Sequence, residues 1–155
     1  GPWGSKITQL AEQAKALGFS VDSIGYTGII SPDDRVSKLQ EVLKSETQPY
    51  ILVGSSMGGY VSLVAAKSAQ PQGLFLLAPA LFMDDYKQQA YTTNTKAIEV
   101  VHGWSDDIIP VEHSIKYAQQ AQCTLHLIAG DHRLNSSLDH VLRLFTNFLQ
   151  AILAN

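Results

Sequence analysis

The stretch that decides the fold is Tyr50-Ile51-Leu52-Val53-Gly54-Ser55-Ser56-Met57-Gly58-Gly59-Tyr60. Its apolar start favours a buried β-strand, and the residues from Tyr60 to Ala66 are typical of a helix. Between them the spacing Gly-x-Ser-x-Gly centres on Ser56. At a sharp strand-to-helix turn the serine takes a strained backbone conformation, and only glycine fits at the flanking positions. The stretch therefore predicts that Ser56 is an exposed nucleophile, although a plain glycine-rich turn has the same spacing.

A nucleophilic serine needs a base, and the base needs an acid that orients it. Two later strand-like runs are followed by these residue types. The run Ala97 to His102 leads into a loop with Asp106, and the run Cys123 to Ile128 leads into a loop with His132. The chain therefore carries nucleophile, acid and base in that order, each just after a strand.

Three motifs together resemble the α/β-hydrolase family over nearly the whole chain, particularly its small bacterial members with almost no cap domain. Gly54 to Tyr60 is similar to the nucleophile elbow, and Gly103 to Pro110 is similar to the acid loop G-x-x-D-x-x-[VI]-P. Gly130 to His132 is similar to the histidine loop. The order of the three motifs is also that of this family, and not that of chymotrypsin or subtilisin.

The resemblance implies a role for each matched residue. Ser56 is the nucleophile, His132 is the general base and then the general acid, and Asp106 orients the imidazole. The backbone N–H of Met57 forms half of the oxyanion hole. In the family the other half comes from a His-Gly loop that directly follows a central strand.

The acid has two alternatives in the sequence. Asp107 adjoins Asp106, and Asp84 lies in the preceding loop, from which some family members draw their acid. The family pattern places the acid three residues after Gly103, which favours Asp106. His102 lies within a predicted strand, where a packed and hydrogen-bonded histidine is the usual case.

Strand-like runs that alternate with helical patterns predict an α/β fold with a mostly parallel sheet of about six strands and helices on both faces. The runs are Phe19 to Ile24, Tyr50 to Val53, Gly73 to Leu77, Ala97 to His102 and Cys123 to Ile128. We expect one α/β-hydrolase domain over residues 1–155, with a minimal cap at Pro79 to Lys96.

The start of the chain bears on the missing oxyanion donor. No strand precedes Gly1 to Ser5, so these residues are interpreted as the tail of the His-Gly loop or, in part, as a cloning remnant. A central strand is then expected upstream. Its place in the sheet lies between the strands that end near Ile24 and Val53.

Three aromatic residues are candidates for substrate binding. Phe82 and Tyr86 lie in the short cap, where they either line an acyl or alcohol pocket or pack within the loop. Trp104 either lines the cleft or packs beneath the acid loop. A small cap implies an open cleft and a substrate of modest size.

Composition excludes several classes of protein. The 155 residues carry a formal net charge of −3 with a pI near 5.9 and no block of Lys or Arg, which argues against nucleic acid or an anionic membrane as partner. A lone cysteine, Cys123, fits a reducing cytoplasm. No metal-ligand spacing or cofactor motif occurs. Homo-oligomerisation is left open.

The sequence thus predicts a serine hydrolase, of the carboxylesterase or thioesterase kind, acting on a small ester or thioester through an acyl-enzyme. The alternative is a binding or regulatory protein on a hydrolase scaffold, with weak or no turnover. The complete set of triad residues argues for the enzyme, and the absence of a His-Gly segment keeps the alternative open.

Overall fold

A computed structural model describes residues 5–155, except for the side chain of Ser5. The elements are α1 (Ser5–Ala16), α2 (Pro32–Leu43), β1 (Ile51–Ser55), α3 (Met57–Ala69), β2 (Gly73–Leu77), β3 (Ala97–Gly103), α4 (Val111–Ala121), β4 (Thr124–Ile128), the short 3₁₀ helix η1 (Asn135–Ser137) and α5 (Leu138–Leu153). Among the described residues the sheet has four strands in the order β1-β2-β3-β4, and every neighbouring pair is parallel.

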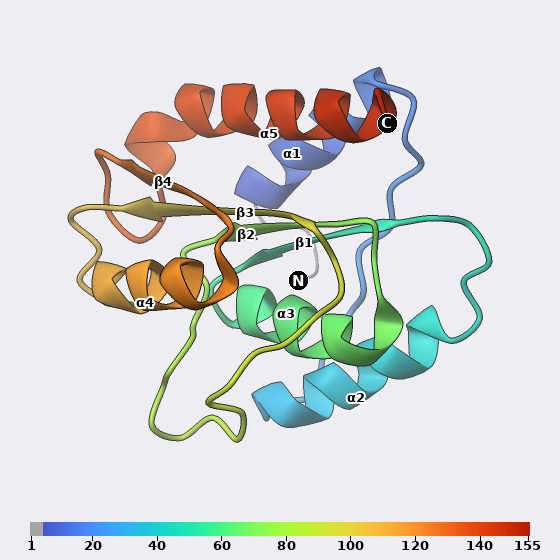
Figure 1. The fold of residues 1–155 in the computed structure, drawn as a ribbon, viewed down its shortest axis with the longest axis horizontal. Coiled ribbons are helices and arrows are strands. Elements are labelled where there is room, and N and C mark those ends of the chain that lie inside the picture. Colours follow the sequence, from blue (N-terminus) through green and yellow to red (C-terminus); the bar gives the residue numbers. More distant parts are fainter. Residues whose placement is uncertain (1–4) are drawn as a thin grey trace.

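Helices cover both faces of this sheet. In Figure 1, α1 and α5 lie on one side, and α3 and α4 lie on the other, with α2 beside α3. β2 is buried along its whole length, as expected for an inner strand of a parallel sheet covered on both faces. The carboxyl ends of neighbouring parallel strands meet at one edge, so the loops that follow β1, β3 and β4 gather there.

The two faces of β2 pack into separate cores. Leu74 and Leu76 belong to the core on the side of α2 and α3, whereas Phe75 and Leu77 belong to the core beneath α1 and α5. The Phe75 ring lies 4.9 Å from the ring of Phe145 in α5. This alternation along one strand fixes its register, because a slip by one residue would exchange the two sets of side chains.

One predicted strand is wrong. Residues 19–24 form no strand, because no neighbouring strand lies beside them to complete a hydrogen-bonded ladder. The sheet found in residues 5–155 therefore has four strands, fewer than the predicted six. The other four strand-like runs are confirmed to within two residues at their ends.

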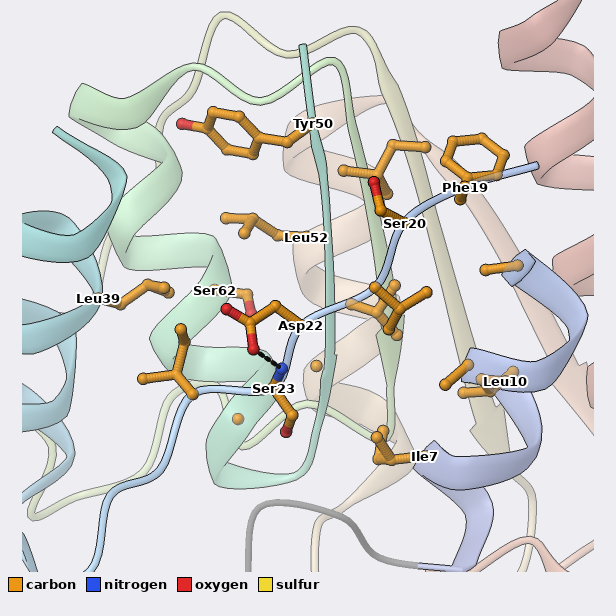
Figure 2. A pocket seen from close by; sticks show the side chains of 18 of the residues that line it. Ile7, Leu10, Phe19, Ser20, Asp22, Ser23, Leu39, Tyr50, Leu52 and Ser62 are labelled. Carbon is orange, nitrogen blue, oxygen red and sulfur yellow. Dashed lines mark hydrogen bonds between the residues drawn. The ribbon is translucent and has the colours of Figure 1, made fainter. Parts of the chain in front are cut away.

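A groove lies between the segment 19–24 and β1. Its volume is about 760 Å³, and Figure 2 shows Ile7 and Leu10 of α1, Phe19, and Leu52 of β1 around it. The two segments do not pair directly, since among residues 5–155 β1 pairs only with β2. That a further strand lies between them stays a prediction, and residues 1–4, the rest of the expected oxyanion loop, lie outside the described part of the chain.

Within residues 5–155, no helix combines the length and the apolar character needed to cross a bilayer.

Candidate active site

The turn between β1 and α3 holds Ser56 in a strained conformation. Its φ and ψ are 56° and −120°, in a region that non-glycine residues seldom occupy. A Cβ atom on Gly54 would lie 2.2 Å from the carbonyl oxygen of Gly58, so position 54 must be glycine. The expectation that Gly58 is sterically required is wrong, because a Cβ atom there would meet nothing within 4 Å. The second restricted position is Gly59, whose added Cβ would lie 2.7 Å from the Cβ of Pro79.

Backbone hydrogen bonds tie this turn to the end of β2. The Ser56 N–H donates to the carbonyl oxygen of Leu77 at 2.9 Å, and the Ala80 N–H donates to the carbonyl oxygen of Ser56 at 2.9 Å. The strained conformation is therefore held from both sides by the neighbouring strand and the loop that follows it. Such over-determination is what allows a strained residue to persist.

The structure brings the three predicted triad residues together. The Oγ of Ser56 lies 3.0 Å from Nε2 of His132, within the expected range of about 2.6–3.2 Å. The Nδ1 of His132 lies 2.8 Å from Oδ2 of Asp106. The side chain of His132 is 14% exposed and that of Asp106 is fully buried. The imidazole therefore bridges the hydroxyl of a half-buried serine and a buried carboxylate.

The chemistry of the three side chains determines which atoms donate and which accept the hydrogen bonds between them. An ionised carboxylate only accepts hydrogen bonds, so Nδ1 of His132 carries the proton that faces Asp106. The Nε2 atom of the neutral ring is then free to accept the Ser56 O–H. This is the tautomer that a general base needs.

The acid loop fixes Asp106 in place. Its Oδ1 accepts the N–H groups of Ile108 and Ile109, each at 2.8 Å. Burial alone would raise the pKa of Asp106, but the hydrogen bonds from His132, Ile109 and Ile108 outweigh burial and lower it. The carboxylate thus stays ionised at neutral pH.

The two alternative acids lie elsewhere. Asp107 and Asp84 are both exposed, and the ring of His132 contacts Asp106 instead of either. In the sequence, the spacing of three residues after Gly103 favours Asp106. The structure shows why that glycine is needed. A Cβ atom on Gly103 would lie 2.3 Å from the carbonyl oxygen of Gly130, because the acid loop and the histidine loop touch there.

Further backbone contacts join the same two loops. The Trp104 N–H donates to Ile128 at 2.9 Å, and the Ser105 N–H donates to Gly130 at 3.0 Å. Beyond Gly130, Oδ1 of Asp131 accepts the N–H groups of Arg133 and Leu134, each at 3.1 Å. The loops that carry the acid and the base therefore form one hydrogen-bonded unit.

Comparisons with known proteins bear on this geometry. No protein-family model and no curated protein matches the sequence. A solved structure from Xanthomonas campestris pv. campestris, assigned to the alpha/beta hydrolase superfamily, matches with a TM-score of 0.86 and 28% identity, over 97% of this chain and 92% of its own. The fold is that of the α/β-hydrolase superfamily.

More distant structures of α/β-hydrolases share the fold. A serine hydrolase without a lid, from Xanthomonas campestris, has a TM-score of 0.80 and 21% identity, over 97% of this chain and 75% of its own. A serine hydrolase homologue from Coxiella burnetii has a TM-score of 0.71 and 19% identity, over 92% of this chain and 74% of its own. The predicted fold class is confirmed.

In this α/β-hydrolase fold, Met57 is the first residue of α3. The first N–H groups of a helix have no acceptor within the helix, and the helix dipole favours negative charge beside them. The N–H of Met57 is therefore suited to the role implied for it, as one donor of an oxyanion hole next to Ser56. The second donor is expected from the His-Gly loop, of which residues 1–5 are interpreted as the tail, and of these residues only the backbone of Ser5 is described.

The predicted substrate residues make contacts of their own. The ring of Phe82 packs against Tyr91 with ring centroids 5.2 Å apart and lies under the Nζ of Lys116 at 4.1 Å. Tyr86 packs edge-on against Tyr60 at 4.8 Å. The Phe82–Tyr91 contact matches the interpretation in which the cap packs its own side chains, whereas Tyr60 belongs to α3 and Lys116 to α4. A role for the two residues in substrate binding stays a prediction, as it does for Trp104, which is 57% exposed.

Sequence reasoning missed one residue near the triad. His102 is the buried, hydrogen-bonded strand histidine that its position predicts, but its Nε2 also lies 3.0 Å from Oδ2 of Asp106. The signal was present in the sequence as the spacing of four residues between His102 and Asp106 around Gly103. Within residues 5–155, no group of three or more His, Cys, Asp or Glu side chains is arranged to hold a metal ion.

Proposed function

We propose that the protein is a serine hydrolase that cleaves a carboxylic ester or thioester through an acyl-enzyme intermediate on Ser56. The observation that carries this proposal is the unbroken series of contacts from Ser56 Oγ to His132 Nε2 at 3.0 Å and from His132 Nδ1 to Asp106 Oδ2 at 2.8 Å. The strained turn, which presents Ser56 at the start of a helix, supports the same assignment.

In the first half of the reaction, Ser56 Oγ attacks the acyl carbonyl carbon while Nε2 of His132 takes its proton. Asp106 stabilises the imidazolium that forms, without itself taking the proton. The negative charge that develops on the carbonyl oxygen is stabilised by the Met57 N–H. When the tetrahedral intermediate collapses, the bond to the leaving alkoxide or thiolate breaks, and His132 supplies its proton.

In the second half, water takes the place of the leaving group. His132 removes a proton from the water as its oxygen attacks the ester carbon of the acylated Ser56. Collapse of the second intermediate breaks the bond to Ser56 Oγ, which recovers its proton from His132. The acid product leaves, and the free enzyme is restored.

The short cap supports substrates of modest size. Residues 78–96, between β2 and β3, form neither helix nor strand and so build no separate cap domain. An open cleft encloses little of a long acyl chain, so a longer chain adds little binding energy. We therefore expect short acyl esters to be turned over with the higher kcat/KM.

Turnover of p-nitrophenyl esters of graded chain length tests this function. The wild type should hydrolyse the short esters, and Ser56→Ala should lower kcat by several orders of magnitude. Ser55→Ala is the matched control, since it removes the neighbouring hydroxyl at the end of β1 and should keep most of the activity. If Ser56→Ala retains half of the esterase activity, the nucleophile is another residue. A folded wild type without turnover on any ester would favour the binding or regulatory alternative.

A further inference from the structure

His102 occupies a position directly behind the triad. It lies on β3, and its side chain is fully buried. The carboxylate of Asp106, four residues further along the chain, is fully buried beside it. Each ring nitrogen of His102 has a polar partner: Nδ1 lies 2.6 Å from Oγ of Ser114 in α4, and Nε2 lies 2.9 Å from the carbonyl oxygen of Ile109.

These partners determine the tautomer of His102. The carbonyl oxygen of Ile109 can only accept a hydrogen bond, so Nε2 carries the proton. In the neutral ring Nδ1 then accepts the O–H of Ser114. Burial lowers the pKa of His102 more than the nearby carboxylate of Asp106 raises it. The ring is therefore neutral at pH 7.

The Nε2 atom also lies close to the predicted triad acid. Nε2 of His102 is almost equally far from the oxygen of Ile109, at 2.9 Å, and from Oδ2 of Asp106, at 3.0 Å. The same Oδ2 accepts from Nδ1 of His132 at 2.8 Å. Two imidazoles, one from β3 and one from the loop after β4, thus converge on one carboxylate oxygen: His132 lies next to Ser56, and His102 lies within the fold.

The two oxygens of Asp106 are held by different groups. Oδ1 is fixed by the N–H groups of Ile108 and Ile109, which belong to the same turn. Among residues 5–155, His132 would be the only group left in contact with Oδ2 without His102, and the charge of His132 changes during the proposed reaction. A donor that stays in place behind Oδ2 prevents the carboxylate from turning when that charge changes.

We propose that His102 is a positioning residue for Asp106: its Nε2–H, shared between Ile109 and Oδ2, holds the carboxylate in line with His132. His102 does not touch the reacting atoms. Its effect on turnover rests on the proposed hydrolase function, whereas its effect on Asp106 does not. The groups that face Asp106 are His102, His132 and the N–H groups of Ile108 and Ile109. Lys6 of α1 also interacts electrostatically with the Asp106 carboxylate.

Three variants separate this role from simple packing. His102→Leu removes the Nε2 donor. His102→Gln restores an N–H donor at a similar reach. Ser114→Ala is the matched control, because it removes the other hydrogen bond of the same buried ring and leaves Nε2 facing Asp106. All three are compared with the wild type by melting temperature, by kcat and KM on a p-nitrophenyl ester, and by NMR titration of the Asp106 carboxyl group.

His102→Leu should lower kcat about tenfold to a hundredfold, the effect of losing a hydrogen bond to a charged group, and leave KM nearly unchanged. It should also raise the pKa of Asp106, because one donor to the ionised form is lost. His102→Gln should recover much of both effects. Ser114→Ala should lower the melting temperature without a comparable change in kcat or in the titration of Asp106.

The proposal is overturned if the titration of Asp106 is the same in the wild type and in folded His102→Leu, or if Ser114→Ala changes it equally. If His102→Leu does not fold, His102→Gln decides, since a merely space-filling role would leave that variant no better than other polar substitutions. If the wild type has no esterase turnover, the proposed function fails, and the titration of Asp106 still tests the role of His102.

Discussion

The two sides of the nucleophile turn differ sharply. On one side, the loops after β3 and β4 are joined by the backbone bonds of Trp104 and Ser105, and both oxygens of Asp106 are held. On the other side, β1 faces a groove of about 760 Å³ that none of the triad residues lines. The difference shows that the three residues of the proposed triad come together through the ends of β1, β3 and β4, with no contribution from the groove. This groove is therefore lined by residues other than the three of the proposed triad.

The largest effect is expected on the side where the loops after β3 and β4 hold Asp106, the closed side of the turn. Asp106→Asn should lower kcat by about 10⁴-fold, because the amide N–H₂ that faces His132 favours the wrong tautomer of the imidazole. Asp107→Asn is the matched control, since Asp107 is exposed and adjacent, and it should retain near wild-type activity. Steady-state kinetics on one ester measures both. Equal losses in the two variants would mean that the acid is misassigned.

The nucleophile turn itself gives the next largest effect. Gly54→Ala should destabilise the fold by about 3–5 kcal/mol or prevent folding, because the new Cβ meets backbone atoms that cannot move aside. Gly58→Ala has open space and lies in a helix, so it should be neutral or stabilise by about 0.5–1 kcal/mol. Urea denaturation compares the two. Similar losses of stability in both would show that the turn differs from the structure described.

A matched pair of phenylalanines compares the packed sheet with the groove. Phe75→Ala on buried β2 should cost about 3–5 kcal/mol of the free energy of unfolding. Phe19→Ala, on the half-buried segment that lines the groove, should cost less than half as much, since part of its surface is already open. Should Phe19→Ala prove as costly as Phe75→Ala, something fills the groove in solution.

The smallest effect concerns pH. The pKa of Asp106 is lower in the folded chain than its unfolded value of about 3.9, so its ionisation stabilises the fold fully above that pH. This contribution is lost as the pH falls through the lower, folded pKa. The difference in unfolding free energy between wild type and Asp106→Asn should therefore shrink between pH 6 and pH 3. A difference that is the same at both pH values would show that the carboxylate is not held as described.

Much of the closed side could be predicted from the sequence, because each of its parts is a local motif. The turn at Ser56 and the loops with Asp106 and His132 each follow a strand, and parallel strands bring such loops together at one edge. The requirement at position 54 was also predictable, whereas that at Gly59 depends on Pro79, which comes from a distant part of the chain.

The open side, where β1 faces the groove, was harder to predict from the sequence. Residues 19–24 have the composition of a strand, but a strand also needs a neighbour with which to pair, and sequence periodicity does not show one. The contact between His102 and Asp106 was missed for a related reason. A histidine within a strand is usually a packed residue, and only the fold shows which loop closes over it.

Covalent labelling with a fluorophosphonate tests the central claim most directly, because only an activated serine reacts readily with it. Intact-mass and peptide mapping should find one adduct on Ser56 in the wild type and in Ser55→Ala. The adduct should be absent in Ser56→Ala and strongly reduced in His132→Ala. A folded wild-type chain that remains unlabelled, or that carries the adduct on a different residue, would contradict the assignment of Ser56 as the nucleophile.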